Sequence, residues 1–530
     1  MRFTRGIGWV GALLALAVAV ALFTRFSFDD TMRRDEAIYA YGGQQLAAGV
    51  PLYRGIFDPK TPVAQALAGA AAALAPGRGF ADVHAIRMAF FVAACLSVVA
   101  VYWLGLVLWG SPLAALLGAT VFASFRSFAL DAVGGPDAKT PGILFAVVAL
   151  ALLVRRRWFW GAFAGSLAAL VWQPFAVYPL VAVGAAFLGA RWRGVRSSLA
   201  GAALPFLVCV AWLWGAGALP AALEATVTYP LYGVERVPET LGERIAHISG
   251  EVWSGYGATG LLLGAGLLAL LVVVVRAWVV AATLVPLVIF SLHDFQGTAD
   301  AYPFLPYAAV GVAGAVALLA ARWRAVVGVA ALVAVFGFSF AGYSHARSRD
   351  TGLLRERSRA VAVERLLNPG EHFEAFGDPL SLVLTGTRDP TRFVYLSEGV
   401  GDWAVRHEFG GFEGFAAGIR ARRPAVVVVD AWTGPLAVRT KRWLKTRYLP
   451  DCMGDWLLFL APGVRERATL RGVPLERPWH LSCRSGGRGV REHPLRVNAG
   501  VDGPGIHERR PALAVAGHVD VEQRLPQRAA

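Results

Sequence analysis

Apolar runs of roughly 15 to 23 residues recur along the first two-thirds of the chain, separated by short polar segments. This is close to the length that an α-helix needs to cross a bilayer. The pattern predicts an all-α polytopic membrane domain over residues 1–343, with about eleven transmembrane helices. The runs are residues 6–24, 86–108, 112–130, 139–154, 158–172, 175–190, 198–218, 256–275, 277–292, 302–321 and 325–343.

The pattern changes after residue 343, where helical and extended segments alternate. It predicts a small α/β domain over residues 344–462. Residues 463–530 are rich in Arg, Gly and Pro and have almost no periodic apolar pattern, so we expect a disordered tail. The elements expected in the small domain are helices at 353–367 and 435–448 and strands at 425–430 and 456–462.

Composition excludes a soluble globule, because 56% of the 530 residues are hydrophobic and only 16% are charged, against about 25% charged in soluble domains. The net charge of +15 does not indicate nucleic-acid binding, since the basic residues before residue 343 lie in short clusters between apolar runs. With the N-terminus inside, these clusters occupy cytoplasmic loops and the acids before residue 343 occupy outer loops. We therefore expect an integral cytoplasmic-membrane protein whose residues from 344 onward lie outside.

Two predicted outer loops are long, residues 25–85 and 219–255. Residues 35–46 of the first loop predict an amphipathic helix lying at the membrane interface. The apolar stretch 62–75 is short for a span and predicts an interfacial or re-entrant helix. The residues of the first helix expected to face the lipid are Ile38, Tyr39 and Leu46.

The first candidate for chemistry is the sequence Arg33-Arg34-Asp35-Glu36, which follows the first predicted span. A carboxylate at the membrane surface can act as a general base, because nearby charges and partial desolvation tune its pKa. Asp35 and Glu36 are therefore candidate catalytic residues. The alternative is a solvated helix start, where the helix dipole favours acids in the first turn.

A pentapeptide with the pattern Asp-x-Lys-Thr-Pro occurs twice, beginning at Asp58 and at Asp137. Its lysines, Lys60 and Lys139, are the only ones before residue 441. An ammonium group beside a helix N-terminus makes a compact anion site, so both lysines are expected to bind a donor phosphate. The alternative is a helix-start signal, in which Asp or Thr caps the helix and Lys extends to lipid headgroups.

Charged residues at the ends of predicted spans are further candidates. Arg87 and Arg126 can contact the same phosphate, although an arginine near a helix end usually extends toward the interface. Cys452 and Cys483 can form a disulfide, whereas no spacing typical of metal ligands occurs. The candidate accessory residues are Asp58, His293, Asp294 and Tyr302.

Residues 33–67, RRDEAIYAYGGQQLAAGVPLYRGIFDPKTPVAQAL, resemble the first extracytoplasmic loop of the dolichyl-phosphate-mannose protein mannosyltransferase-like family. This family includes the lipid A aminoarabinose transferases and consists of polytopic C-superfamily glycosyltransferases. The resemblance covers about residues 1–343, and the later stretch HDFQGTADAYPFLPYAAVG is similar to a Tyr- and Pro-rich span of the family. It implies that Asp35 is the catalytic aspartate, that Lys60 belongs to the family's Lys-x-Pro segment, and that Asp137 is the acid of the second outer loop.

The chain departs from the family around Lys60. Thr61 and Pro62 stand where members often have two prolines, and Pro59 stands where some members have an acid. The sequence therefore specifies neither the donor sugar nor a cofactor: a divalent metal is possible but not required.

The resemblance implies transfer of a sugar from a polyprenyl-phosphate donor to a lipid, glycan or protein acceptor on the outer face of the membrane. Asp35 would deprotonate the acceptor hydroxyl, while Lys60, Lys139 and Arg87 would stabilise the departing phosphate. Two alternatives remain open at this stage. One is a secondary transporter or flippase of envelope precursors, and the other is a non-catalytic envelope-assembly protein.

Overall fold

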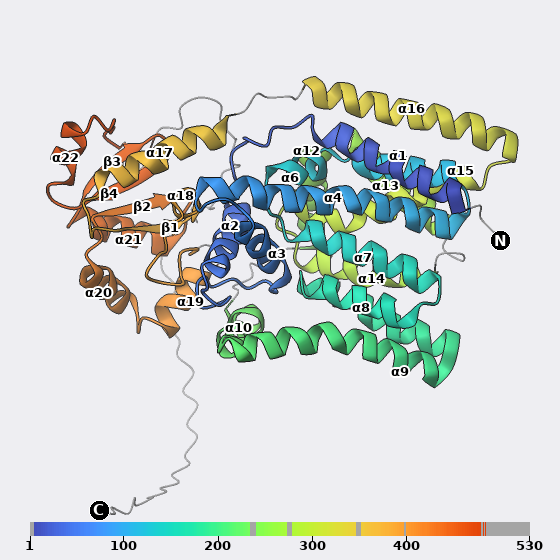
Figure 1. Ribbon diagram of the computed structural model, residues 1–530, viewed down its shortest axis with the longest axis horizontal. Helices are drawn as coiled ribbons and strands as arrows, with labels where there is room; N and C mark the ends of the chain where they lie inside the picture. The colour runs from blue at the N-terminus through green and yellow to red at the C-terminus, as the bar shows by residue number, and fades with distance from the viewer. Residues whose placement is uncertain are drawn as a thin grey trace, which may run out of the picture. The chain divides into compact units, whose positions relative to one another are not determined.

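The computed structural model describes residues 5–233, 240–272, 278–345, 351–396, 399–478, 481 and 483. A helix occupies each of the segments predicted to span the membrane (Figure 1). These helices are α1 (Arg5–Phe23), α4 (Phe80–Trp109), α5 (Pro112–Ala123), α6 (Arg126–Gly134), α7 (Lys139–Val154), α8 (Trp158–Ala169), α9 (Val177–Gly215), α13 (Thr259–Val272), α14 (Trp278–His293), α15 (Leu305–Ala317) and α16 (Ala321–His345).

Helix length limits how many of these elements cross a membrane as single straight spans. Among the described residues, Phe80–Trp109, Gln173–Gly215 and Ala321–Ser344 are long and apolar enough, and α5 with α6 adds a fourth span bent by 68°. Helix α9 covers two predicted spans, which a break at Ala190 separates. The apolar helices indicate an integral membrane protein. Helices lie at the positions of the roughly eleven predicted spans, but most of them are too short to cross a bilayer as single straight helices.

The apolar helices approach one another through small residues. A Cβ atom at Gly118 of α5 would lie 2.9 Å from the carbonyl oxygen of Ala309 in α15, and one at Gly311 would overlap the Gly266 carbonyl of α13. Such close backbone contact is typical of helix packing in membranes, where hydrophobic burial between helices contributes little.

The predicted first outer loop contains α2 (Arg34–Ala47) and α3 (Val63–Ala73). The expectation that α2 exposes Ile38 and Tyr39 to lipid is wrong, since these side chains are only 6% and 2% exposed. Helix α2 packs on α3, where a Cβ at Gly43 would lie 2.6 Å from that of Ala68. Part of the small C-terminal domain covers another side of α2, because the Gln44 amide donates to the Val383 carbonyl at 2.9 Å.

The predicted second outer loop contains three short elements and one longer helix. The short elements are α10 (Leu219–Leu223), the π-helical turn η2 (Glu224–Thr228) and α11 (Tyr229–Tyr232), and the longer helix is α12 (Leu241–Tyr256). Two 3₁₀ turns precede membrane helices, η1 (Gln173–Ala176) before α9 and η3 (Thr298–Phe304) before α15.

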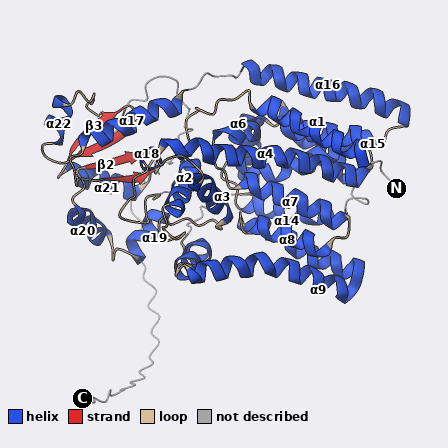
Figure 2. Ribbon diagram, viewed as in Figure 1, coloured by secondary structure: helices blue, strands red, loops and turns tan. Residues whose placement is uncertain are grey.

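The C-terminal domain is a four-stranded mixed sheet with strand order β1-β2-β4-β3 (Figure 2). Strands β1 (Phe373–Gly377) and β2 (Val426–Asp430) are parallel, and β4 (Trp456–Leu460) is antiparallel to both β2 and β3 (Leu449–Met453). The predicted helices and strands of this domain are confirmed. The helices are α17 (Gly352–Leu366), α18 (Leu380–Thr385), α19 (Val400–His407), α20 (Phe412–Arg422), α21 (Pro435–Lys445) and α22 (Val464–Leu470).

The ordered domain extends beyond residue 462, so the predicted start of the disordered tail is wrong. Helix α22 buries Val464 and Ala468, and Cys452 forms a disulfide with Cys483. The pairing of these two cysteines is confirmed. The rest of the predicted tail, from residue 484, lies outside the described residues.

The disulfide supports a prediction about stability. Cross-linking residues 31 positions apart restricts the unfolded chain, so Cys483→Ser is expected to destabilise the C-terminal domain by about 3 to 4 kcal/mol. Thermal unfolding of the detergent-solubilised protein, with and without reductant, measures the change. Cys209→Ser is the control, because Cys209 is a free thiol. Equal transitions for Cys483→Ser and the unaltered protein would contradict the prediction.

Candidate functional site

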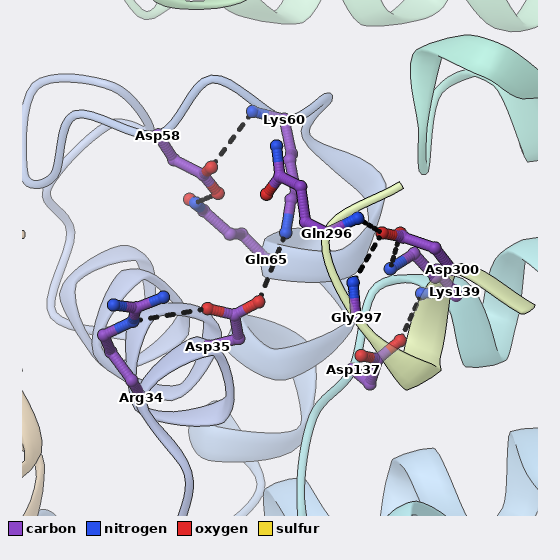
Figure 3. A network of polar contacts seen from close by, with 10 residues as sticks. All are labelled: Arg34, Asp35, Asp58, Lys60, Gln65, Asp137, Lys139, Gln296, Gly297 and Asp300. Carbon is purple, nitrogen blue, oxygen red and sulfur yellow. Dashed lines mark hydrogen bonds and ion pairs between the residues drawn. The ribbon is translucent and has the colours of Figure 1, made fainter. Parts of the chain in front are cut away.

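A cavity of about 690 Å³ brings together polar residues that are far apart in the sequence. Four sequence-predicted candidates line it: Asp35, Lys60, Lys139 and Asp294. Figure 3 shows part of this polar network. The other lining residues are Arg34, Pro59, Trp172, Gln173, Pro174, Thr226, Val227, Tyr229, Pro230, Leu231, Phe290, Gln296, Gly297, Ala299 and Asp300.

Asp35 lies in the first turn of α2, between two cations. Its Oδ2 is 3.6 Å from Lys60 Nζ, and its Oδ1 is 3.8 Å from Arg34 Nε. The Lys60 ammonium also lies 5.4 Å from the centre of the Tyr39 ring. This arrangement leaves Asp35 half-exposed to the cavity, so a bound molecule can reach its carboxylate.

The charge around Asp35 determines its protonation state. Burial raises the pKa of Asp35, but Lys60, Arg34 and Lys139 lower it by more, so the pKa lies below its ordinary value. Burial lowers the pKa of Lys60, but Tyr39 and Asp35 raise it well above its ordinary value. At neutral pH, Asp35 is therefore a carboxylate beside an ammonium ion.

The two Asp-x-Lys-Thr-Pro copies adopt the same local structure. Asp58 Oδ1 accepts the backbone N–H of Lys60 at 3.0 Å, and Asp137 Oδ1 accepts that of Lys139 at 2.7 Å. Each aspartate thus closes a turn two residues long, as Asp side chains commonly do, and neither occupies the N-cap of the following helix. The aspartate therefore shapes the backbone without capping the helix, and the lysine lines the cavity. The phosphate-binding role of the two lysines stays a prediction.

Asp58 makes a second hydrogen bond in addition to the one that closes the turn. Its Oδ2 accepts the Gln65 amide at 2.5 Å, and burial raises the pKa of Asp58 to about 6. Thr61 donates to the Ala169 carbonyl at 3.1 Å, which attaches the turn to the end of α8. These contacts position Lys60, so Asp58 contributes to the cavity indirectly and does not line it.

Asp300 is the main site residue that the sequence analysis missed. Its Oδ1 is 2.7 Å from Lys139 Nζ, and its Oδ2 accepts the backbone N–H groups of Gln296 at 2.7 Å and Gly297 at 3.2 Å. Lys139 also lies 5.4 Å from the centre of the Trp172 ring. Asp300 could have been found as the acid within the Tyr- and Pro-rich stretch, whereas no signal indicated Trp172.

Several predicted candidates lie outside the cavity lining. Glu36 is buried, accepts the Arg33 backbone N–H at 2.7 Å, and so closes the first turn of α2. Burial raises the pKa of Glu36 to about 8. Asp137 contributes its turn, as described above. Tyr302 is also buried, and its hydroxyl donates to Asp131.

The arginine candidates are not brought to the cavity either. Arg87 is fully buried and donates to the Phe28 and Asp30 carbonyls, the latter at 2.9 Å, so it anchors the segment that follows α1. Arg126 and His293 are exposed and do not line the cavity. The cations available to a molecule in the cavity are therefore Arg34, Lys60 and Lys139.

A metal role receives no support from the geometry. Within the described part of the chain, no group of three or more His, Cys, Asp or Glu side chains is arranged to hold a metal ion. The cavity combines carboxylates, among them the half-exposed Asp35, with ammonium groups and with aromatic or proline surfaces such as Trp172, Tyr229 and Phe290. Such a site can accept a proton, bind an anion and hold an apolar or sugar-like group.

Comparison of the sequence finds no matching protein-family model and no significantly similar curated protein. The fold, however, is similar to that of ArnT from Cupriavidus metallidurans bound to undecaprenyl phosphate, with a TM-score of 0.62 and 14% identity over 86% of this chain and 99% of that chain. It is also similar to the archaeal oligosaccharyltransferase AglB from Archaeoglobus fulgidus, in complex with an inhibitory peptide and a dolichol-phosphate. There the TM-score is 0.55, with 12% identity over 85% of this chain and 73% of that chain. The fold expected from the resemblance is thus confirmed, because this chain shares it with ArnT and AglB.

Proposed function

We propose that this protein transfers a sugar from a polyprenyl-phosphate donor to an acceptor on the extracytoplasmic face of the membrane. The observation that carries the proposal is the meeting of Asp35, Lys60 and Lys139 in one cavity. Binding of lipid phosphates by ArnT and AglB, which have the same fold, supports this donor class.

In the proposed reaction, an acceptor hydroxyl attacks the anomeric carbon in line with the departing phosphate. A new C–O bond forms to the acceptor, and the bond between the anomeric carbon and the phosphate oxygen breaks. The electron pair of the broken bond leaves with the polyprenyl phosphate, and the hydroxyl proton passes to the Asp35 carboxylate. The anomeric configuration is inverted, because one direct displacement occurs.

Lys60 and Lys139 stabilise the negative charge that develops on the phosphate. Each ammonium has three N–H donors and makes one carboxylate contact, Lys60 with Asp35 and Lys139 with Asp300. Donors therefore remain for phosphate oxygens. Asp300 keeps Lys139 in place, since backbone N–H groups and the ammonium occupy its two oxygens.

The test of this proposal is a comparison of envelope glycans between strains with and without the protein. Loss of one sugar, accompanied by accumulation of its polyprenyl-phosphate form, is the expected result. Identical glycans and identical lipid-linked sugars in both strains would contradict the proposal.

Topology provides a second prediction. The arginine clusters favour an extracytoplasmic C-terminal domain, and a disulfide is typical of an oxidising compartment. A reporter that is active only in the cytoplasm should therefore be silent when fused after residue 484. The matched control is the same reporter fused after Arg156, in a predicted cytoplasmic loop, where activity is expected. Activity of the C-terminal fusion would place the cavity on the wrong face for this reaction.

The pH dependence of transfer distinguishes the two adjacent carboxyl groups. Asp35 must be ionised, and its pKa is lowered by Lys60, Arg34 and Lys139, so activity should persist into the acid range and disappear only as the pH falls through the lowered Asp35 pKa. Lys60→Ala removes the cation that lowers this pKa most, so the acid limb of kcat/KM should move to higher pH. If Glu36 were the base instead, its pKa of about 8 would place the acid limb near pH 8.

A further inference from the structure

One wall of the cavity comes from the second outer loop. The π-helical turn η2 and the short helix α11 supply Thr226, Val227, Tyr229, Pro230 and Leu231 to the lining. Apolar side chains of this wall, including Val227 and Leu231, are exposed. A π-helical turn is uncommon and often occurs at functional sites. We refer to residues 224–232 as the outer wall.

The outer wall is attached to the C-terminal domain through Glu224. Its Oε2 is 2.8 Å from Arg392 Nη2, and its Oε1 accepts the indole N–H of Trp403 at 3.2 Å. The side chains of Arg392 and Glu224 are 16% and 30% exposed, so water only partly screens this ion pair. Both carboxylate oxygens of Glu224 are thus held by residues more than 160 positions later in the chain.

Aromatic contacts reinforce the same attachment. The Tyr229 ring lies edge-to-face against Trp403, with centroids 5.7 Å apart, and against Phe57, with centroids 5.5 Å apart. Phe57 in turn stacks on Phe393 at 5.1 Å. Edge-to-face and offset aromatic pairs contribute favourable energy beyond the area they bury.

Arg392 also bonds to the segment that leads into a second part of the cavity lining. Its carbonyl accepts the backbone N–H of Phe57 at 2.7 Å, and Phe57 directly precedes the turn that carries Lys60. One residue of the C-terminal domain therefore bonds to the Lys60 turn through its backbone and to the outer wall through its side chain. A shift of Glu224 away from Arg392 would therefore move the outer wall relative to the Lys60 turn and change the shape of the cavity.

We propose that the C-terminal domain forms part of the donor site, with Glu224, Arg392 and Trp403 as positioning residues that hold the outer wall against the hydrocarbon next to the donor phosphate. This inference rests on the proposed function, because it assigns the lipid phosphate as the molecule in the cavity. It gives residues beyond 343 a role in substrate binding rather than in chemistry. Loss of the attachment should therefore raise KM for the donor and leave kcat nearly unchanged.

The experiment uses the full-length protein in detergent, with the variants Arg392→Ala and Glu224→Gln. Hydrogen exchange of the backbone amides in residues 222–232 measures the attachment directly. Loss of a hydrogen-bonded ion pair of this exposure should change the equilibrium for local opening by about tenfold. Amide exchange in Arg392→Ala should therefore accelerate by about tenfold. The affinity for undecaprenyl phosphate should fall by a similar factor, and KM for a donor that carries this lipid phosphate should rise by a similar factor.

Two further variants keep the test specific. Glu408→Gln is the matched control, since Glu408 contacts the same arginine at 3.5 Å but lies away from the cavity, and it should change neither exchange nor affinity. The double exchange Glu224→Arg with Arg392→Glu should restore part of the slow exchange and part of the donor affinity. It is made in the Glu408→Gln background, because Glu408 would otherwise repel a glutamate at position 392. A variant that merely folds less well would lower the active fraction without changing KM.

The outcomes separate the inference from the proposed function. Unchanged exchange in Arg392→Ala, or accelerated exchange with unchanged lipid-phosphate affinity and KM, would overturn the inference. Failure of the unaltered protein to bind undecaprenyl phosphate would contradict the proposed function, while the exchange measurement would still report whether Glu224 holds the wall.

Discussion

Asp35→Asn is expected to lower the rate of sugar transfer by about 10²- to 10⁴-fold, the usual contribution of a general base. Asparagine keeps the volume of the side chain but cannot accept the hydroxyl proton. It also removes a negative charge from beside Lys60, which lies 3.6 Å away, so donor affinity should stay the same or increase. The expected signature is a large fall in kcat without a rise in KM, measured on folded protein.

The matched control for this substitution is Asp294→Asn. Asp294 also lines the cavity, but its carboxylate accepts only a side-chain amide, that of Gln296 at 3.1 Å, among the contacts described. The control should retain most of the activity. Near-normal turnover in Asp35→Asn would refute the assignment of Asp35, and Glu36→Gln would then be the next variant to measure.

Lys60→Ala and Lys139→Ala are each expected to lower kcat/KM for the donor by about 10- to 100-fold, the range for a hydrogen bond to a charged group. The double substitution should differ from the sum of the single effects, because in the proposed reaction both ammonium groups contact one phosphate. Arginine should restore only part of the activity, since a planar guanidinium does not replace a compact ammonium. The control is Lys441→Ala, because Lys441 lies in the C-terminal domain and donates to the Trp432 carbonyl at 3.0 Å.

The aspartates of the two pentapeptides separate the structural from the functional contribution. Asp58→Asn keeps an oxygen that can accept the Lys60 N–H, so activity should largely remain, whereas Asp58→Ala should lower the yield of folded protein. If the pentapeptide only shaped the backbone, both lysine variants would show normal turnover for each folded molecule. That result would remove Lys60 and Lys139 from the phosphate site.

The membrane helices could be located from the sequence because an apolar run of sufficient length has few alternatives in a bilayer. The C-terminal domain was less predictable. Strand β1 was missed because it contains Glu374, a charged residue in a buried strand. Arg422, 48 positions later in the chain, compensates this burial by donating to both carboxylate oxygens at 2.6 and 2.9 Å. Helix α2 was assigned to the lipid interface because its sequence contains no sign that Tyr41 would meet the backbone N–H of Asp389 at 2.9 Å.

Within the site, unusual residue usage was more informative than charge alone. The scarcity of lysine identified Lys60 and Lys139, which both reach the cavity. Nothing in the sequence indicates that the Arg87 guanidinium bonds to the carbonyls of Phe28 and Asp30, outside the cavity lining. Asp300 was missed because its importance depends on an ion pair with a residue 161 positions earlier, which only the tertiary structure creates.

The central claim is sugar transfer from a polyprenyl-phosphate donor with Asp35 as the general base. It is tested most directly by measuring the release of polyprenyl phosphate from a panel of polyprenyl-phosphate sugars. The assay contains the purified protein and membranes that carry the acceptor, prepared from a strain that lacks this protein. The unaltered protein should release the lipid phosphate from one donor in proportion to the sugar transferred. Asp35→Asn should release it at a rate at least about 10²-fold lower. No release from any donor, or equal release by the unaltered protein and Asp35→Asn, would contradict the claim.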